Sequence, residues 1–499
     1  MTMTDFPILT ILVFLPLAGS LFLFPFWKNE GIAKVTALIV AVAELALAGW
    51  IYLAGPAALS ASDKLPGFFL TEDSAWIKRF GIRYTLGMDG ISLLLVLLTA
   101  FTMVVAIVAA WRWVKERGTL HYFLILAMES GIMGVFLSLD LFLFYLFWEV
   151  MLIPMFFLIG IWGDGRCIYS TVKFFLYTLA GSLLMLVAII GLYLIHGSQT
   201  GIYTFALAGL LHTALSPATG FWLFAAFLLA FAIKIPLFPF HTWLPDAYSD
   251  SSITGTLIMA ALMAKTGAYG LIRFAYPLFP EAAARFTPFI LALAVIGILY
   301  GSWIAYAQQD MKRLIAYSSF GHMGFIALGI AAWTPVALSG AVLQMVNHGI
   351  TTGALFVVIG MLGERAATRE AKSFGGLWGR VPVFAFFFLL FSMASAGLPG
   401  LNNFTGEFMI LIGSFKVAKL PVILAYLGII LPLIYTVRLV QDILFGEEKR
   451  VRLEGKDDLS LREGALVTVM ALFVVYLGVH PGPVLELVRT PVAFLTGIR

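Results

Sequence analysis

FLLAFAIKIPLFPFHTWLPDA, residues 227–247, joins an apolar run to three prolines and contains one lysine, Lys234. The prolines are Pro236, Pro239 and Pro245. Proline has no backbone N–H to donate, and its ring clashes with the preceding turn of a helix. We therefore expect a membrane helix in this segment that breaks just after Lys234.

A second apolar segment has the same design. Residues 391–411 read FSMASAGLPGLNNFTGEFMIL, with Gly397, Pro399 and Gly400 at the centre and Glu407 in the second half. Broken helices at matching places in two halves of a chain point to a transporter built from inverted repeats. Backbone groups freed at membrane depth need protein or water around them, so both breaks predict a hydrated interior. A proline kink without function is the alternative.

The composition is that of a membrane protein. Of the 499 residues, 61% are hydrophobic and 12% are charged, whereas soluble domains carry about 25% charged residues. The mean hydropathy is +0.99. A helix needs about 20 apolar residues to cross the hydrocarbon. Such runs lie near 7–26, 35–54, 90–111, 120–139, 141–161, 172–195, 220–248, 255–275, 286–307, 313–332, 336–362, 381–416, 420–444 and 465–482.

These runs predict an all-α membrane fold of about 14 transmembrane helices. The expected parts are helices 1–3 in 1–119, a first inverted repeat of helices 4–8 in 120–275, a second of helices 9–13 in 286–444, and helix 14 in 465–499. The longest polar loops, about 55–88 and 445–464, leave no room for a soluble catalytic domain. The one cysteine, Cys167, excludes an internal disulfide and a cysteine-held cluster.

The distribution of positive charge predicts the orientation. The odd-numbered loops hold 19 of the 31 Lys and Arg residues, and the even-numbered loops with both termini hold 10. Cytoplasmic loops carry the excess of positive charge, so both termini are expected outside. The N-terminal MTMTDF lacks the basic region of a signal peptide, so the first apolar run is expected to remain as a helix.

Four charged residues, Glu149, Lys234, Lys265 and Glu407, lie inside apolar runs. A charge in hydrocarbon costs roughly 2.5–3.5 kcal/mol on the mildest scale, and such residues usually mark ion pathways or proton relays. Nothing on its own helix neutralises Glu149, so we expect it to pair with Lys234 from another helix. Burial and the acid act in opposite directions on the lysine, which makes the pair a possible switch. A purely structural ion pair is the alternative.

Lys265 lies 31 residues after Lys234, enough for a half-helix, a turn and a return to the same depth. Snorkelling to the headgroups is the alternative, but Lys265 is about ten residues from either helix end, roughly 15 Å along the axis. Arg273, at the end of the same helix, fits snorkelling better.

His322 and His348 lie on consecutive helices between the lysines and Glu407. Histidine titrates near neutral pH and can pass protons through either ring nitrogen, which favours a relay over satisfied core residues. For Glu407 the alternative is a cap on the half-helix that starts near Asn402, because an acid suits the first turn of a helix.

Other candidates are weaker. Glu44 and Glu129 lie in spans without an evident partner, and Glu129 is a possible secondary site. Asp89 and Asp140 fit span boundaries. His241, Asp246 and Asp250 follow the broken helix and could line a path for protons. No GxxxxGK[ST] phosphate loop or HExxH motif occurs, so no nucleotide or metal chemistry is indicated.

Three stretches carry a family likeness. KIPLFPFHTWLPDA (234–247), DMKRLIAYSSFGHMGF (310–325) and MAKTGAYGLIRF (263–274) resemble the antiporter-like membrane subunits of respiratory complex I and of Mrp sodium/proton antiporters. The likeness covers roughly 85–445. Glu407, where relatives of the L and N type usually carry a lysine, and WEVMLIPMF (148–156) are similar to the M type.

The resemblance implies roles for individual residues. Glu149 would pair with the central lysine Lys234, Lys265 would be the connecting lysine, His322 and His348 would continue the axis, and Glu407 would be the terminal acid. Where the family often reads HTWLPDAHTEAPT, this chain has HTWLPDAYSDSSIT, with Tyr248 and Asp250, which puts a role of that loop in proton uptake in doubt.

The resulting hypothesis is a proton-translocating subunit of NADH:quinone oxidoreductase in a bacterial inner membrane, beside other antiporter-like subunits. The resemblance implies that FMN, iron–sulfur clusters and quinone are in partner subunits, with no cofactor or metal in this chain. The alternatives are an Mrp-type cation/proton antiporter subunit, a subunit of a membrane hydrogenase or formate-linked complex, and a structural membrane spacer.

Overall fold

A computed structural model describes residues 6–55, 67–449 and 458–497 of the chain. Most of the N-terminal MTMTDF, on which the expectation about a signal peptide depends, lies outside these residues. The contacts divide the chain into two compact units. Unit 1 comprises the described residues of Met1–Ile235, Leu262–Thr287 and Glu486–Arg499, and unit 2 comprises those of Pro236–Ala261 and Pro288–Leu485.

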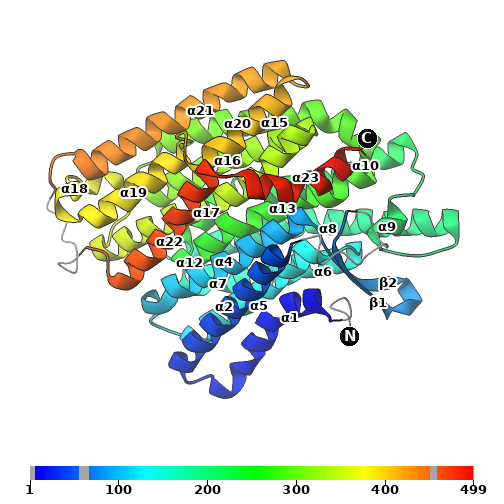
Figure 1. The fold of residues 1–499 in the computed structure, drawn as a ribbon, viewed down its shortest axis with the longest axis horizontal. Helices are drawn as coiled ribbons and strands as arrows, with labels where there is room; N and C mark the ends of the chain where they lie inside the picture. Colours follow the sequence, from blue (N-terminus) through cyan, green and yellow to red (C-terminus); the bar gives the residue numbers. More distant parts are fainter. Residues whose placement is uncertain (1–5, 56–66, 450–457, 498–499) are drawn as a thin grey trace. The chain divides into compact units, whose positions relative to one another are not determined.

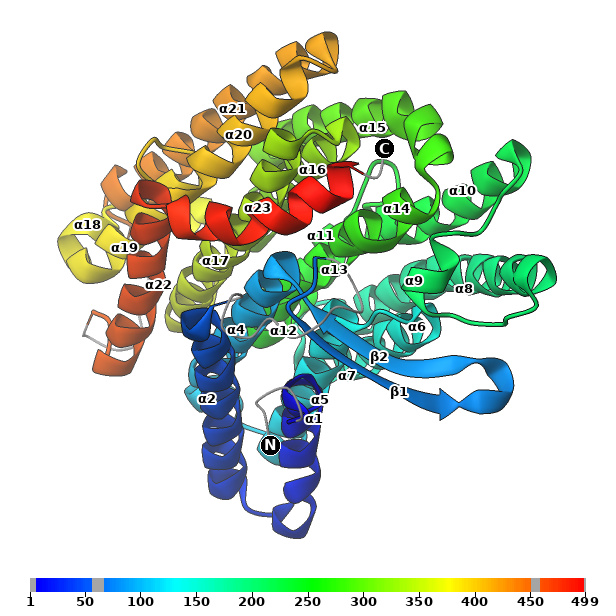
Figure 2. The same cartoon turned by 45° about the vertical axis from the view of Figure 1, so that its right-hand side comes forward.

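Unit 1 is a helical bundle with one β-hairpin. In it α4 and α5 pack against α2 (Figures 1 and 2), and α8 packs along α10. Its elements are α1 (Ile8–Phe22), η2 (Phe24–Phe26), α2 (Glu30–Ala54), β1 (Leu70–Ile77), η3 (Lys78–Phe80), β2 (Ile82–Met88), α4 (Gly90–Trp113), α5 (Gly118–Leu137), α6 (Leu141–Val150), α7 (Leu152–Trp162), α8 (Cys167–Thr200), α9 (Leu207–Leu210), α10 (Pro217–Lys234), α13 (Ala264–Gly270), η5 (Leu271–Ala275) and α14 (Tyr276–Leu278).

The regular elements in the described residues of unit 2 are all helices, and α17 packs against α16, α19 and α20 at its centre. Its elements are α11 (Trp243–Asp250), α12 (Ile253–Ile258), α16 (Met311–Ala332), α17 (Pro335–Ala366), η6 (Ala371–Ser373), α18 (Leu377–Arg380), α19 (Pro382–Ser395), α20 (Asn402–Phe415), α21 (Lys419–Val440), η7 (Gln441–Phe445) and α22 (Leu461–Val479). Three elements continue from one unit into the other: η4 (Met259–Met263), α15 (Pro280–Ala307) and α23 (Gly482–Gly497).

The described residues contain 13 helices that are long and apolar enough to cross a membrane. They correspond to 13 of the 14 predicted runs. The remaining run, 381–416, is the second of the two segments predicted to break, and it consists of the two shorter helices α19 and α20. The all-α membrane fold and both helix breaks are therefore confirmed. The helix α23, which follows α22, was not predicted.

Several helices begin where the sequence supplies a capping side chain. Asp89, Asp140 and Asp310 each accept a backbone N–H from the first turn of α4, α6 and α16. A side-chain oxygen at this position satisfies backbone donors that the helix itself leaves free. Asp89 and Asp140 are thus boundary residues, as expected. Burial raises the pKa of the Asp140 carboxyl to about 6, against the effect of hydrogen bonds from three backbone N–H groups.

The polar loop expected near 55–88 contains a structure that periodicity did not reveal. Strands β1 and β2 pair antiparallel, from Leu70 opposite Met88 to Ile77 opposite Ile82. Glu72 on β1 accepts hydrogen bonds from the backbone N–H groups of Leu9 and Thr10. The hairpin is therefore fastened to the first turn of α1.

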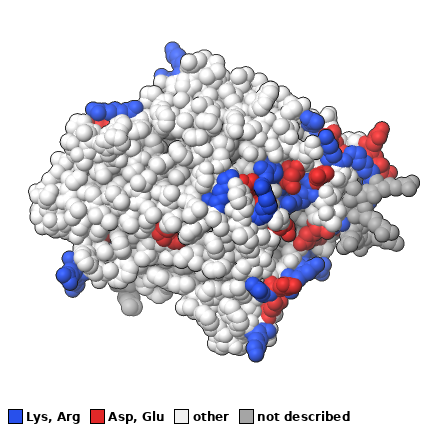
Figure 3. Space-filling view, turned by 180° about the vertical axis from the view of Figure 1, so that it is seen from behind, with Lys and Arg blue, Asp and Glu red and all other residues white. Residues whose placement is uncertain are grey.

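Charged side chains are sparse on the face shown in Figure 3, where most of the visible surface is uncharged. Large apolar side chains are instead exposed on many helices, including Leu53, Val187, Trp222, Trp303 and Leu420. Apolar exposure on this scale marks a surface that meets lipid or another protein. The chain is therefore an integral membrane protein.

Candidate functional site

The first break places a lysine at the end of a half-helix. Helix α10 ends at Lys234, and α11 begins at Trp243. The Lys234 side chain is buried, with 1% of the residue exposed. The expectation that the proline-rich stretch ends the helix just after this lysine is confirmed.

Lys234 and Glu149 do not form the direct ion pair that we expected. No described residue lies within hydrogen-bonding distance of Lys234 Nζ, and no salt bridge within 4.0 Å joins it to a described acid. Glu149 is half-buried on α6, near enough to act on Lys234 electrostatically, and Tyr145 forms a hydrogen bond with it. The pair is coupled through space without contact, because α6 and α10 hold the two side chains apart.

Aromatic rings surround the Lys234 ammonium instead. Its Nζ lies 5.3 Å from the centroid of the Trp148 ring and 5.4 Å from that of Phe174. Both distances are within the range of a cation–π contact. Sequence reasoning missed this arrangement, although Trp148 directly precedes Glu149.

Lys265 lies on a helix of unusual form. It belongs to α13, which is enclosed between the π-helical turns η4 and η5. Such turns are rare and often occur at functional sites. The Lys265 side chain is fully buried, so it does not snorkel to the headgroups. Gly270 lets α13 approach α10, since a Cβ there would lie 2.3 Å from the Phe231 ring.

The expectation that Arg273 snorkels was wrong. Its Nη2 lies 2.5 Å from Asp89 Oδ2, with side chains 4% and 2% exposed, and its Nε donates to the Tyr269 hydroxyl. The Tyr269 hydroxyl in turn donates to the backbone carbonyl of Phe136. This buried pair joins η5 to the start of α4, and it was missed because its partners are 184 residues apart.

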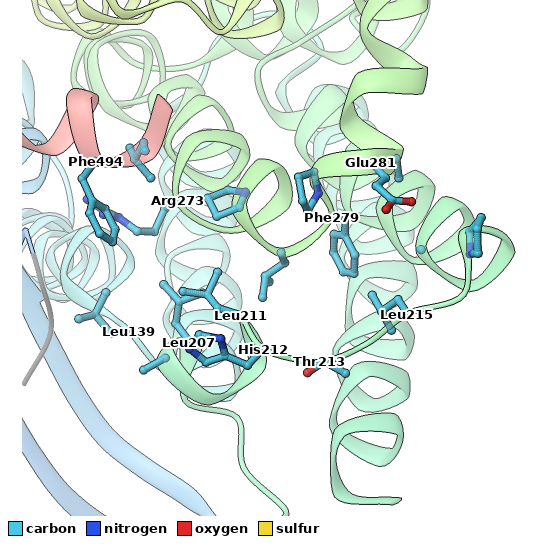
Figure 4. Close-up of a pocket in the computed structure, with 18 of the residues that line it drawn as sticks. Leu139, Leu207, Leu211, His212, Thr213, Leu215, Arg273, Phe279, Glu281 and Phe494 are labelled. Carbon is cyan, nitrogen blue, oxygen red and sulfur yellow. The ribbon is translucent and has the colours of Figure 1, made fainter. Parts of the chain in front are cut away.

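A cavity of about 680 Å³ lies beside this pair in unit 1. Figure 4 shows Arg273 and Phe494 at one end of the cavity and Glu281 at the other. Leucine, phenylalanine and proline side chains form most of its walls. Neither Lys234 nor Lys265 lines it, so this cavity is separate from the side chains predicted to carry protons.

The buried pair allows a test of stability. We expect Asp89→Asn to destabilise the protein by roughly 3–5 kcal/mol, because Arg273 then keeps a buried charge without its counter-ion, while asparagine still caps α4. The measurement is the free energy of unfolding in detergent. The matched control is Asp73→Asn, which removes the exposed pair with Arg83 and should cost about 0–1 kcal/mol. Equal effects of the two substitutions would contradict this account.

In unit 2, Glu407 is the centre of a buried polar cluster. Its Oε1 lies 2.6 Å from His322 Nδ1 and accepts a hydrogen bond of 3.0 Å from Gln344 Nε2. The rings of His322 and His348 are 5.6 Å apart between centroids. Three of the predicted residues are therefore brought together, on α16, α17 and α20. Gln344 was missed, although it lies four residues before His348 on the same face of α17.

The second break lies beside this acid. Gly397 and Gly400 have backbone φ angles of +77° and +93°, which residues other than glycine rarely adopt. A Cβ at Gly397 would lie 3.6 Å from Glu407 Oε2. The alternative that Glu407 caps α20 was wrong, because its carboxylate turns to His322 and Gln344.

The start of α20 is held by a neighbouring helix. Asn347 Nδ2 donates to the Asn402 carbonyl over 2.6 Å, and Asn402 Nδ2 donates to the Asn347 carbonyl over 3.0 Å. Thr351 Oγ1 adds a bond of 2.8 Å to Asn402 Oδ1. These contacts fix α20, and with it Glu407, against α17.

The residues after the first break are packed rather than exposed. His241 stacks on Phe320 with ring centroids 4.3 Å apart, and Asp250 is buried at the end of α11. Asp246 pairs with Arg313 over 3.2 Å. A role of His241, Asp246 or Asp250 in proton access stays a prediction.

Glu44 on α2 and Glu129 on α5 are both fully buried. They interact electrostatically with each other, and none of their carboxylate oxygens has a hydrogen-bond partner among the described residues. Their juxtaposition in unit 1 was not predicted. A secondary role for Glu129 also stays a prediction. Among the same residues, no group of three or more His, Cys, Asp and Glu side chains could hold a metal ion.

Comparison with known proteins gives consistent matches. Residues 138–431 match the family described as NADH:quinone oxidoreductase/Mrp antiporter, TM. NADH-quinone oxidoreductase subunit M of Pseudomonas aeruginosa is 42% identical over 491 residues, which cover 96% of each chain. Subunit M of Escherichia coli K12 is 39% identical over 485 residues, 95% of each chain.

Two solved structures extend these matches. A chain of respiratory complex I from Thermus thermophilus with bound NADH is 32% identical with a TM-score of 0.86, covering 98% of this chain and 100% of that one. A chain of the Mrp complex from Dietzia has a TM-score of 0.88 at 21% identity, covering 100% of this chain and 99% of that one. The second likeness shows a shared fold.

Proposed function

This chain belongs to the NADH:quinone oxidoreductase/Mrp antiporter membrane family, and we propose that it translocates protons as a membrane-arm subunit of an NADH:quinone oxidoreductase. One observation carries the proposal: a protonatable group is buried at each of two broken helices. Lys234 ends one half-helix, and Glu407 follows the other break. Buried ionisable groups beside broken helices are the arrangement by which transporters bind ions at membrane depth.

The proton passes through five side chains in this scheme, and a sixth, Glu149, controls its release. A charge change in a neighbouring subunit moves the Glu149 carboxylate relative to Lys234, and the altered field releases the lysine proton. The proton then continues by way of Lys265, His322 and His348 toward Glu407. A change of one pKa unit corresponds to about 1.4 kcal/mol, so a small movement of one charge near a buried site is enough to switch it.

The chain architecture is proposed to follow the same logic. Residues 120–275 and 286–444 form two inverted repeats, preceded by helices in 1–119 and followed by a C-terminal part in 465–499. The excess of Lys and Arg in the odd-numbered loops supports a position of both termini outside a bacterial inner membrane.

The energy source lies in other chains. FMN, iron–sulfur clusters and quinone are held by partner subunits in this proposal, and this chain contributes a proton path only. The side chains described here fit that division, since they supply carboxyl, amine and imidazole groups at membrane depth and one half-buried cysteine, Cys167.

Co-purification tests the proposal directly. A tag on this chain should isolate, from membranes dissolved in mild detergent, a particle that reduces quinone with NADH. The control is the same tag on an unrelated membrane protein of the same cells. Recovery of hydrogenase activity, or of small membrane partners with sodium-dependent transport and no NADH oxidation, would overturn the assignment to NADH:quinone oxidoreductase.

A further inference from the structure

Two aromatic residues stand where a counter-ion for Lys234 was expected. The ammonium lies 5.3 Å from the Trp148 ring centroid and 5.4 Å from that of Phe174, and no described group accepts a hydrogen bond from it. The face of an aromatic ring carries partial negative charge and attracts a cation, whereas it has no comparable attraction for a neutral amine. The two rings therefore favour the protonated form of the lysine.

Packing fixes both rings in place. The Trp148 ring lies against Phe144 and Phe231, each with centroids 5.6 Å away, and its indole N–H has no hydrogen-bond partner among the described residues. Phe174 is fully buried on α8, which packs along α10. The two faces come from α6 and α8 and meet at the end of α10, so the arrangement depends on tertiary structure.

We propose that Trp148 and Phe174 are positioning residues that hold the protonated Lys234 ammonium while Glu149 is out of contact. The inference rests on the proposed function and adds a specific state to it. The lysine can keep its proton without a direct ion pair, and the Glu149 carboxylate changes that balance through its field. The two rings thus set the proton affinity of Lys234 before the Glu149 carboxylate moves.

Charged and titratable groups also lie on the elements that pack around Lys234. Glu149 is the acid that the structure couples to Lys234. The same elements also carry Tyr145 on α6, Tyr169, Lys173, Tyr177, Tyr193 and His196 on α8, Lys265 and Tyr269 on α13, and Arg273 on η5. Any test must leave these groups unchanged, which excludes charge substitutions and favours a change confined to a ring.

Stepwise fluorination of Phe174 in the intact complex is such a test. One, two and three ring fluorines draw electron density from the ring face and change its shape very little. We expect the alkaline limb of the profile of proton pumping against pH to move to lower pH with each fluorine. Since each fluorine weakens the attraction of the ring face for the ammonium, the full series should move the limb by roughly 0.5–1 pH unit. NADH:quinone activity reports that the complex remains assembled.

Phe175 supplies the matched control. It is half-buried on the same helix and packs against Phe156 with ring centroids 5.5 Å apart. Fluorination there should leave the profile unchanged. Trp148→Phe keeps a ring and should shift the limb less than Trp148→Leu. Full pumping with an unmoved limb across the Phe174 series would overturn the cation–π proposal and leave the assignment of the chain intact. Failure of the assignment would instead appear as a lack of co-purifying NADH:quinone activity.

Discussion

Vesicles carrying Lys234→Ala are expected to lose proton pumping by more than about tenfold, while NADH oxidation in the assembled complex continues. A positioned acid–base group contributes roughly 10²–10⁴ to proton transfer, and alanine offers none. The substitution also removes a buried charge, so folding is not put at risk by an unpaired cation. The measurement is the quench of a pH-sensitive dye after addition of NADH, normalised to the rate of quinone reduction.

The control for this experiment is Lys28→Ala. Lys28 is exposed between η2 and α2, and its loss should leave pumping unchanged. Normal pumping by an assembled Lys234→Ala complex would refute the relay and support an inert role for the buried charges.

Glu407→Gln is expected to have an effect of similar size. The amide keeps the shape of the side chain and can still hydrogen bond with His322 and Gln344, so the cluster should stay folded. It cannot release or accept a proton at neutral pH, so proton transfer from the two histidines to this position should stop. Proton pumping should fall by more than about tenfold, with quinone reduction and complex assembly retained.

Two further substitutions make the result specific. Glu370→Gln changes an exposed acid of unit 2 and should leave pumping intact. Glu407→Asp keeps the carboxyl but shortens its reach, and it should pump better than the glutamine variant. If glutamine and aspartate at this position pumped equally well, proton exchange by the carboxyl would be ruled out.

The features that sequence predicted well are those set by local chemistry. The prolines after Lys234 and the Gly397–Gly400 stretch each disfavour a helical backbone within one turn, and both helices break there. The burial of Lys265 also followed from its distance to either helix end. Such constraints involve only residues that are close together in the chain, so they can be predicted from the sequence.

The features that sequence did not predict depend on residues far apart in the chain. From its position in the sequence, Arg273 was predicted to be a cation at a helix end. Its partner Asp89 lies 184 residues earlier, so the sequence did not indicate their ion pair. The sequence does not distinguish Gln344 from other polar residues. Its role is visible only in the fold, where Glu407 on α20 accepts its hydrogen bond. The distance between Glu149 and Lys234 is set by how α6 and α10 pack, and the likeness to a family indicates the two residues without giving their separation.

The pair of asparagines at the start of α20 changes how its helix break should be understood mechanically. A gap in a helix is commonly regarded as a hinge, because backbone hydrogen bonds are missing across it. Here Asn347 and Asn402 bind each other's carbonyls, so a movement of the start of α20 away from α17 would break two hydrogen bonds at once. The second break therefore acts as a brace between α17 and α20. A displacement of α20 that keeps these two hydrogen bonds has to carry α17 with it.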